Sequence, residues 1–297
     1  MAGAPFVTVV VPHFQDLEGL KVCLSALERQ TYPADRFEII VADNNSPVGE
    51  AEVARAVAGR AKLVRVVEPG AGMARNGGVA RATGELLAFT DSDCIPDPAW
   101  LAAGVAALAD HDFVGGAMRV SVTDPSSPSP VEAFELVFAF HNKAYVRSKG
   151  FTVTANLICR RDMFEKTGGF RSQVSEDVEW CRRATAAGFR LGYAAGAIVT
   201  HPARRSWPEL ERKLVRLTSE TYALMLEQPF GKLRWLLYAL ALPPSAIVHT
   251  PLALLSPALR TSDARWGALR TLYKSRLWRS RECFGLLGQS RSTSRQA

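Results

Sequence analysis

The sequence predicts an α/β fold with a central, mainly parallel sheet flanked by helices. Three observations predict it. In the first half of the chain, short apolar runs alternate with amphipathic segments of helical periodicity. Each of the first four runs ends in a polar or glycine-rich stretch. The regular order of strand, helix and strand is typical of parallel strands joined by right-handed crossovers.

The elements of the first half follow from this alternation. Apolar residues without helical spacing predict strands, and glycine or proline bounds them, as Gly84 and Pro96 do on either side of the fourth run. The expected strands are Phe6–Val11, Phe37–Ala42, Leu63–Val67, Glu85–Thr90 and Phe113–Ala117. The helices expected between them are Leu17–Gln30, Glu50–Ala58, Met73–Ala82 and Ala99–Ala109.

The second half changes character and predicts fewer, less regular elements. A phenylalanine-rich helix is expected over Val131–Arg147, and the Gly168-Gly169 pair should end a short helix over Arg161–Lys166. Ser175 is a good N-cap for a helix that runs to Ala187. The remaining expected elements are strands over Thr152–Cys159 and Ala197–Thr200 and a helix over Trp207–Gln228.

Asp91-Ser92-Asp93 directly follows the fourth predicted strand. In extended chain, side chains two residues apart point the same way, so both carboxylates can face one ligand. Paired oxygen ligands suit a hard divalent cation, which often bridges protein to phosphate. Ligands of such sheets bind at the carboxyl ends of the strands. The other strand ends carry Pro12-His13, Asp43-Asn44-Asn45 and the glycine-rich stretch before Arg75-Asn76, so the sequence favours a nucleotide site there.

Several classes of site and protein are excluded. The stretch Gly70–Arg75 lacks the third glycine of the dinucleotide fingerprint, and no phosphate-binding Gly-x-x-x-x-Gly-Lys motif occurs. The five cysteines are scattered without a Cys-x-x-Cys pair, which argues against a zinc site and for a reducing environment. Met1–Pro5 is short and uncharged, so no secretory signal is expected. The charge distribution does not indicate a nucleic-acid binder.

Glu176 and Asp177 open the helix predicted after Gly168-Gly169-Phe170. Acids in a first turn complement the helix dipole, and this capping role is the ordinary explanation for one of them. Adjacent helical residues diverge by about 100°, so only one can face a cleft squarely. The dipole also favours an ionised carboxylate, as a general base requires. A histidine follows the last predicted strand at His201, where a surface role is the commoner one.

Seven motifs in order resemble those of family 2 glycosyltransferases, which have the nucleotide-diphospho-sugar-binding GT-A (Rossmann-like) fold. The resemblance covers roughly residues 6–203. The motifs are Val9-Val10-Val11-Pro12, Ile40–Ser46, Gly72–Gly78, Phe89–Asp93, Asn156–Arg161 with Gly168-Gly169-Phe170, Glu176-Asp177 with Trp180, and Val199-Thr200-His201.

The resemblance implies roles for the matching residues on the donor side. Asp43, with Asn44 beside it, would recognise the nucleobase or ribose, and Pro12 would line the base pocket. Many relatives carry a second acid at the position of Asn44, which leaves the nucleobase open. Arg75 and Asn76 would lie near the nucleotide and diphosphate. The cation, Mn²⁺ or Mg²⁺, would be held by Asp91 and Asp93, with His201 as a further ligand.

On the acceptor side, the resemblance implies that Asp177 deprotonates the acceptor hydroxyl, with Glu176 beside it. Trp180 would stack on an acceptor sugar or pack beneath the helix, and Asn156 would face the acceptor. The function expected is metal-dependent, inverting transfer from a nucleotide-diphosphate-sugar, with UDP as the default nucleotide. Polysaccharide, glycolipid or cell-envelope glycan biosynthesis is the expected setting. A nucleotidyltransferase and a non-catalytic nucleotide-sugar-binding subunit are the alternatives.

The last third of the chain predicts a helical, membrane-associated extension. The formal charge is +7, and basic residues outnumber acidic ones only after residue 203. Trp235–Leu259 has no charged side chain, but its prolines favour a re-entrant or interfacial hairpin, with a true span and a buried soluble subdomain as the alternatives. Arg265–Leu287 predicts a basic amphipathic helix for an anionic lipid surface. We therefore expect a catalytic domain over 1–204, an extension over 205–297, and a location at the cytoplasmic face of a membrane.

Overall fold

The computed structural model describes residues 3–289, which form two compact units. The sheet unit comprises residues up to Arg119, Phe140–Ser172 and Glu176–His201. The helical unit comprises Val120–Ala139, Gln173–Ser175 and the chain from Pro202 onward. The helical unit thus includes a segment from the middle of the chain, in addition to the C-terminal residues that the sequence assigns to an extension. The boundary at residue 204 stays a prediction.

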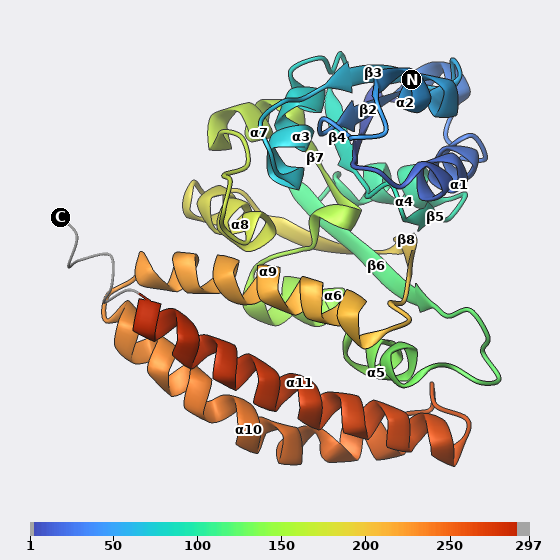
Figure 1. Ribbon diagram of the computed structural model, residues 1–297. Coiled ribbons are helices and arrows are strands. Elements are labelled where there is room, and N and C mark those ends of the chain that lie inside the picture. Colours follow the sequence, from blue (N-terminus) through green and yellow to red (C-terminus); the bar gives the residue numbers. More distant parts are fainter. Residues whose placement is uncertain (1–2, 290–297) are drawn as a thin grey trace. The chain divides into compact units, whose positions relative to one another are not determined.

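An eight-stranded sheet forms the centre of the sheet unit, in the order β3-β2-β1-β4-β7-β6-β8-β5. β1 is parallel to β2 and β4, and β2 is parallel to β3 (Figure 1). β7 lies antiparallel between β4 and β6, so β6 runs in the same direction as β4. The strands are β1 (Val7–His13), β2 (Phe37–Asp43), β3 (Lys62–Arg65), β4 (Leu86–Phe89), β5 (Ile95–Pro96), β6 (Phe113–Ser121), β7 (Leu157–Arg160) and β8 (Leu191–Pro202).

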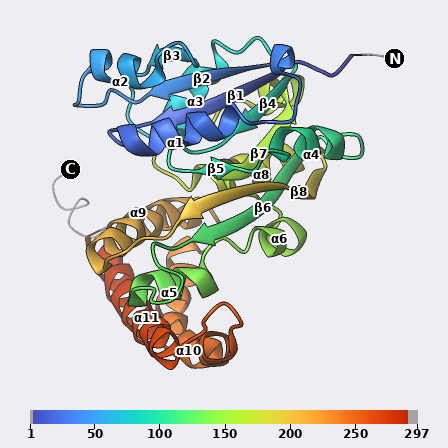
Figure 2. The same cartoon turned by 90° about the vertical axis from the view of Figure 1, so that its right-hand side faces the viewer.

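Helices cover both faces of this sheet. Alternate residues of β1 point to opposite faces, and accordingly Val9 and Val11 join one hydrophobic cluster while Val10 joins another. The first cluster includes residues of α1 (Leu17–Leu27), α2 (Glu50–Val57) and α4 (Trp100–Ala107). The second includes residues of α3 (Ala71–Val79), α7 (Arg161–Thr167) and α8 (Glu176–Ala186). Figure 2 shows β1, β2 and β4 side by side. The predicted α/β class is confirmed.

The helix predicted over Val131–Arg147 is wrong, because the chain breaks in its middle. α5 (Pro130–Phe138) ends just before Phe140, whose φ of 54° lies in the left-handed region and stops an α-helix. α6 (Asn142–Ala144) then continues into a π-helical turn, η2 (Tyr145–Lys149). The remaining short turns are η1 (Ala34–Arg36) and η3 (Thr154–Asn156), and the latter replaces the start of the strand predicted at Thr152.

The helical unit is built from α5, α9 (Trp207–Leu226), α10 (Gly231–Leu255) and α11 (Ser262–Gln289). A capping box begins α5, because Ser129 accepts from the N–H of Glu132 and Glu132 accepts from that of Ser129. α10 and α11 form an antiparallel pair (Figure 1). Trp235 near the start of α10 donates to the carbonyl of Cys283 near the end of α11, at 3.0 Å.

The hairpin predicted within Trp235–Leu259 is wrong, because this stretch lies almost entirely in the continuous helix α10. The helix contains Pro243, Pro244 and Pro251. Pro243 has no N–H to donate to the carbonyl of Ala239, four residues earlier. The Ser280 hydroxyl of α11 donates to that carbonyl at 2.8 Å instead. A donor from the neighbouring helix thus replaces the hydrogen bond that the proline removes.

Candidate active site

The carboxyl ends of β1, β2 and β4 bring the predicted donor-side residues together. His13 and Asp43 are register partners at the ends of β1 and β2. The Asp43 carboxylate is buried, lies 2.8 Å from Nδ1 of His13, and accepts from the N–H of Ser46 at 3.0 Å. Nε2 of His13 is buried and has no hydrogen-bond partner within residues 3–289. His13 was not predicted as a site residue, although it directly follows Pro12 at the end of the first strand.

The side chain of Asn44 forms hydrogen bonds with the loop that leads from β3 to α3. Its amide nitrogen donates to the carbonyls of Val66 and Glu68, at 3.1 and 2.6 Å, and its amide oxygen accepts from the N–H of Gly70 at 2.8 Å. These bonds place the N-terminus of α3 beside the end of β2. The direct contact of Asn44 with a nucleobase stays a prediction, as do those of Pro12 and Asp43.

The Asp91–Asp93 pair lies directly after β4 in a partly open position, with side chains 32% and 39% exposed. Ligand atoms of Asp91, Asp93 and Cys94 lie within 4.8 Å of one another. Burial raises the pKa of the Cys94 thiol well above its ordinary value, and the two aspartates raise it further. Cys94 is therefore a neutral packing residue, and the carboxylates are the groups suited to a hard cation.

His201 at the end of β8 lies beside this pair. Its Nε2 is 3.4 Å from Oδ2 of Asp93, and its side chain is buried. The ring of Phe140 packs against the His201 ring with centroids 4.8 Å apart, which fixes its orientation. The structure thus brings His201 next to Asp93, which lies close to Asp91. The convergence of two carboxylates and an imidazole fits a divalent cation of the Mn²⁺ or Mg²⁺ type.

Arg75 of α3 is the buried centre of the site. Its Nη2 donates to Oδ1 of Asp91 at 2.6 Å, and its Nη1 donates to Oε1 of Glu176 at 3.0 Å. Burial works against its charge, but the two carboxylates outweigh burial and raise the pKa of Arg75 above its ordinary value. Gly72, three residues earlier, allows α3 to lie close to Phe170, because a Cβ at position 72 would lie 3.1 Å from Cβ of Phe170.

Asn76 contacts the backbone of Phe170 with both ends of its amide. Its nitrogen donates to the Phe170 carbonyl and its oxygen accepts from the Phe170 N–H, both at 2.8 Å. This pair of bonds ties α3 to the loop that precedes α8. The predicted approach of Asn76 to the diphosphate stays a prediction, and its observed contacts are structural.

Glu176 and Asp177 begin α8, as the sequence predicts, and they take different surroundings. Glu176 is held by Arg75, whereas Oδ1 of Asp177 accepts from the N–H of Val178 at 2.8 Å. Tyr145 of η2 is within electrostatic range of Asp177. Burial raises the pKa of the Tyr145 hydroxyl, and the Asp177 carboxylate adds to the rise. Tyr145 was not predicted, because nothing in its sequence neighbourhood marks it.

Two predicted acceptor residues are corrected by their burial. Trp180 has no exposed surface; its indole N–H donates to the carbonyl of Gly168 at 2.9 Å, and its ring packs on Phe164 and Phe170. Asn156 is equally buried, accepts from Trp100 and donates to the carbonyl of Ala197. The packing alternative predicted for Trp180 is confirmed, and the acceptor role predicted for Asn156 is wrong, because both groups join elements beneath the site.

Comparison with known proteins identifies the family. The family model described as "Glycosyl transferase family 2" matches residues 8–168. This chain belongs to glycosyl transferase family 2. The matched segment contains β1 to β4 and the residues at their carboxyl ends, so the predicted family is confirmed and the protein is a glycosyltransferase.

Curated relatives extend the likeness beyond the matched segment. Glycosyltransferase AglE of Haloferax volcanii is 35% identical over 221 residues, 72% of this chain and 72% of that protein. Pre-mycofactocin glycosyltransferase of Mycobacterium tuberculosis is 28% identical over 218 residues, 68% of this chain. The alignment spans 44% of that longer relative. Both relatives of this family 2 chain are glycosyltransferases by name.

A solved structure agrees with the fold. The mannosyltransferase PcManGT from Pyrobaculum calidifontis, determined in complex with GDP-Man and Mn²⁺, matches with a TM-score of 0.60 and 21% identity. The match covers 94% of this chain and 88% of that one. At this identity the likeness shows the fold, and it agrees with the GT-A architecture expected of the family.

Proposed function

We propose that the protein transfers a sugar from a nucleotide-diphosphate-sugar to an acceptor hydroxyl with inversion at the anomeric carbon. The observation that carries the proposal is the arrangement around Arg75. One buried guanidinium joins Asp91, in the candidate cation pair, to Glu176, which neighbours the candidate base Asp177. This arrangement supports a donor group and an acceptor group on either side of Arg75.

Asp91, Asp93 and His201 are the residues that would hold the divalent cation. When bound, the cation would act as a Lewis acid that offsets negative charge on the diphosphate. Arg75 would hold Asp91 toward this position, and it donates to only one of the two carboxylate oxygens of Asp91 in the structure. The other carboxylate oxygen is then available for the cation.

Asp177 would take the proton from the acceptor hydroxyl. The acceptor oxygen forms a bond to the anomeric carbon while the bond to the diphosphate breaks, and the bonding electron pair leaves with the diphosphate. A single displacement of this kind inverts the configuration. The N-terminal end of α8 favours the ionised carboxylate that accepts the proton.

The proposal leaves the nucleotide of the donor to be decided by comparing the binding of different nucleotide-sugars. UDP was the default expectation from sequence, and the bound GDP-Man of PcManGT adds a GDP-sugar as an equal candidate. His13 and Asp43, which end β1 and β2, are the groups we propose to face the base, since Nε2 of His13 is buried without a partner in the described chain.

Thermal unfolding with a panel of UDP-, GDP- and dTDP-sugars, with and without Mn²⁺, tests the donor site. Ligand at about 100 times its Kd stabilises the folded state by about 2.7 kcal/mol, which gives a measurable shift in Tm. We expect a shift with one nucleotide class that requires both Mn²⁺ and Asp93. Asp93→Ala should abolish it, and the surface control Asp162→Ala should keep it. No shift with any donor would contradict the proposal, and binding without sugar transfer would favour the non-catalytic alternative.

Membrane association is a second part of the proposal, supported by the exposed surface of the helical unit. α10 is long and apolar enough to span a bilayer by length and composition alone. It exposes Leu233, Leu237, Leu240, Val248, Leu252 and Leu255 at helical spacing along one face. A face of this kind suits the interfacial region of a bilayer.

The sequence predicts an apolar face and a separate basic face on α11, and the structure does not show this separation. Leu272 is buried, and Trp266, Leu277 and Phe284 are exposed on the same stripe as the basic residues Arg270, Lys274 and Arg281. The reason is that α11 packs on α5, α9 and α10 and buries its inner residues. Exposed cations and aromatics together are still suited to an anionic lipid surface.

Co-sedimentation with vesicles tests this part. We expect the protein to sediment with phosphatidylcholine vesicles that contain phosphatidylglycerol, and much less with phosphatidylcholine alone. The triple variant Leu237→Ser, Leu240→Ser, Val248→Ser should lose most of the bound fraction while keeping the donor-induced Tm shift. Equal sedimentation of the variant and the native protein would contradict a membrane role for this face. The proposed location is the cytoplasmic side of the membrane.

A further inference from the structure

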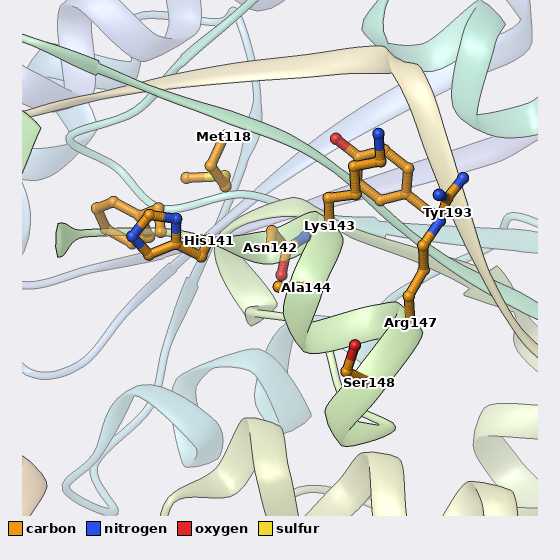
Figure 3. Close-up of a pocket in the computed structure, with 9 residues that line it drawn as sticks. Met118, His141, Asn142, Lys143, Ala144, Arg147, Ser148 and Tyr193 are labelled. Atoms are coloured by element: carbon orange, nitrogen blue, oxygen red, sulfur yellow. The ribbon is translucent and has the colours of Figure 1, made fainter. Parts of the chain in front are cut away.

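A pocket of about 440 Å³ lies in the sheet unit, apart from the residues already assigned to the donor. The segment from Phe140 to Ser148 forms one wall, and Met118 of β6 and Tyr193 of β8 complete it. Figure 3 shows Lys143 and Arg147 extending in the same direction toward Tyr193, with His141 and Met118 at the other end. Its size is within the usual range of small-ligand pockets.

The lining of this pocket is cationic. It includes His141, Lys143 and Arg147, and no aspartate or glutamate is among the residues that line it. Lys143 and Arg147 are exposed, and neither makes an ion pair with an acid in the part of the chain that the structure describes. Burial raises the pKa of the Tyr193 hydroxyl, and the positive charge of Arg147 opposes this rise, which agrees with the proximity of the two side chains. Two unneutralised cations on one wall favour an anion.

The wall that carries these cations is fixed in place. The buried Asn142 side chain donates to the carbonyl of Gly116 at 2.7 Å and accepts from the N–H of Val153 at 3.1 Å. Tyr145 stacks on Phe151 with ring centroids 4.9 Å apart. Phe140 holds a left-handed backbone conformation, which is costly for an aromatic residue and is often retained at functional sites. The π-helical turn η2 is a feature of similar meaning.

The same wall adjoins both halves of the candidate active site. Phe140, which lines the pocket, packs on the ring of His201, and His201 lies 3.4 Å from Asp93. The Asp177 carboxylate helps to raise the pKa of the hydroxyl of Tyr145, which lies between Lys143 and Arg147 in sequence. The pocket therefore adjoins the candidate cation site through Phe140 and His201, and the segment that lines it carries a tyrosine whose hydroxyl responds to the charge of the candidate base.

We propose that this pocket binds a phosphate group carried by the acceptor, with Lys143 and Arg147 holding the phosphate and Tyr193 packing on the part of the acceptor next to it. The proposal rests on the function proposed above and names its acceptor class. A phosphate monoester supplies several acceptor oxygens and about two negative charges for these donors. A lipid phosphate and a phosphorylated saccharide share this chemistry.

Titration calorimetry of the full chain without donor tests the pocket directly. The probes are inorganic phosphate, glucose 6-phosphate, hexyl phosphate and, as the neutral control, glucose. We expect the phosphate esters to bind and glucose not to bind. The double variant Lys143→Gln, Arg147→Gln should weaken phosphate-ester binding at least ~10-fold, because it removes charge-assisted hydrogen bonds. Lys166→Gln, an exposed basic residue paired with Asp162 on α7, is the matched control and should leave it unchanged.

The outcomes separate this proposal from the one on which it rests. Tighter binding of hexyl phosphate supports the proposal with a lipid phosphate, and tighter binding of glucose 6-phosphate supports it with a saccharide. Phosphate-ester binding that is absent, or that the double variant retains, overturns it. A parallel loss of the Mn²⁺-dependent nucleotide-sugar Tm shift in the double variant also overturns it, because the pocket would then belong to the donor. If that shift is absent from the native protein, the proposed function fails instead.

Discussion

Arg75 donates to Asp91 with 2.6 Å between Nη2 and Oδ1. The guanidinium is buried, and its second nitrogen holds Glu176 at the start of α8. A buried cation is stabilised only where its partners satisfy it, so these carboxylates and Arg75 depend on one another. The position of the candidate base on α8 is thereby tied to the candidate cation pair after β4.

Arg75→Lys should test this dependence. A lysine amine cannot reproduce two separate hydrogen bonds from a planar group, so α8 and Asp91 should lose their fixed relation. We expect the sugar-transfer rate to fall roughly 10²-fold, as misplacement by about 1 Å can produce. The measurement is kcat with the donor found above, together with Tm.

The matched control for Arg75→Lys is Arg161→Lys, which alters a partly exposed arginine that pairs with Glu165 on α7. This variant should keep both kcat and Tm near the native values. An Arg75→Lys enzyme with an unchanged rate would mean that the pairing is not needed for transfer.

Asp177→Asn should remove the general base and leave the donor site intact. We expect kcat to fall about 10²–10⁴-fold, the usual range for loss of a general base. The donor-induced Tm shift should persist, because Asp177 belongs to α8 and not to the strand ends that form the donor side. Asp162→Asn, which changes an acid in the first turn of α7, is the control. Retention of most of the rate by Asp177→Asn would assign the base to another residue.

Trp180→Phe should affect stability and not acceptor recognition. The substitution removes the indole N–H that donates to Gly168 and part of the ring packing beneath α8. We expect the free energy of unfolding to fall by about 1–3 kcal/mol, the cost of an unmet buried hydrogen bond. Denaturant titration measures this loss. An increase in the KM for the acceptor at unchanged stability would restore the stacking role that the burial of Trp180 contradicts.

The strands and the acids at their ends were predictable from sequence, because alternation and strand-end composition are local signals. Asp91 and Asp93 follow a buried run directly, and i to i+2 spacing is enough to place them on one side. Their proximity to His201 was not local, and it came from the order of family motifs. The surroundings of Trp180 and Asn156 could not be read in this way, since burial depends on elements that come from elsewhere in the chain.

The helical features were harder to predict for a related reason. The break at Phe140 has no glycine or proline to mark it, so the cations of the pocket were assigned to a continuous helix. In α10 the opposite error occurred, because Pro243 suggested a break that Ser280 of another helix compensates. Both cases depend on tertiary contacts that override local preference.

Glu38 provides a test of how one partly buried hydrogen-bond network stabilises the sheet. Its carboxylate accepts from Thr8, from the N–H and hydroxyl of Thr83, and from Lys62 at 2.6 Å. Burial alone would raise the pKa of Glu38, but these bonds outweigh it and lower the pKa from 4.5 to about 2. A carboxylate with a lowered folded-state pKa stabilises fully above its unfolded value. That stabilisation is therefore lost as the pH falls from about 4.5 toward 2.

Glu38→Gln should lower the free energy of unfolding by about 1–3 kcal/mol at pH 7, as expected for lost hydrogen bonds to a charged group. The difference between native protein and variant should shrink as the pH falls below 4.5, because Glu38 of the unfolded chain takes up a proton there while the folded carboxylate is still ionised. Denaturant titrations at pH 7 and pH 3 measure both quantities. Glu18→Gln, which removes an exposed carboxylate paired with Lys21, should show little difference at either pH. A Glu38→Gln difference that is equal at the two values would show that the charge of Glu38 does not contribute to stability.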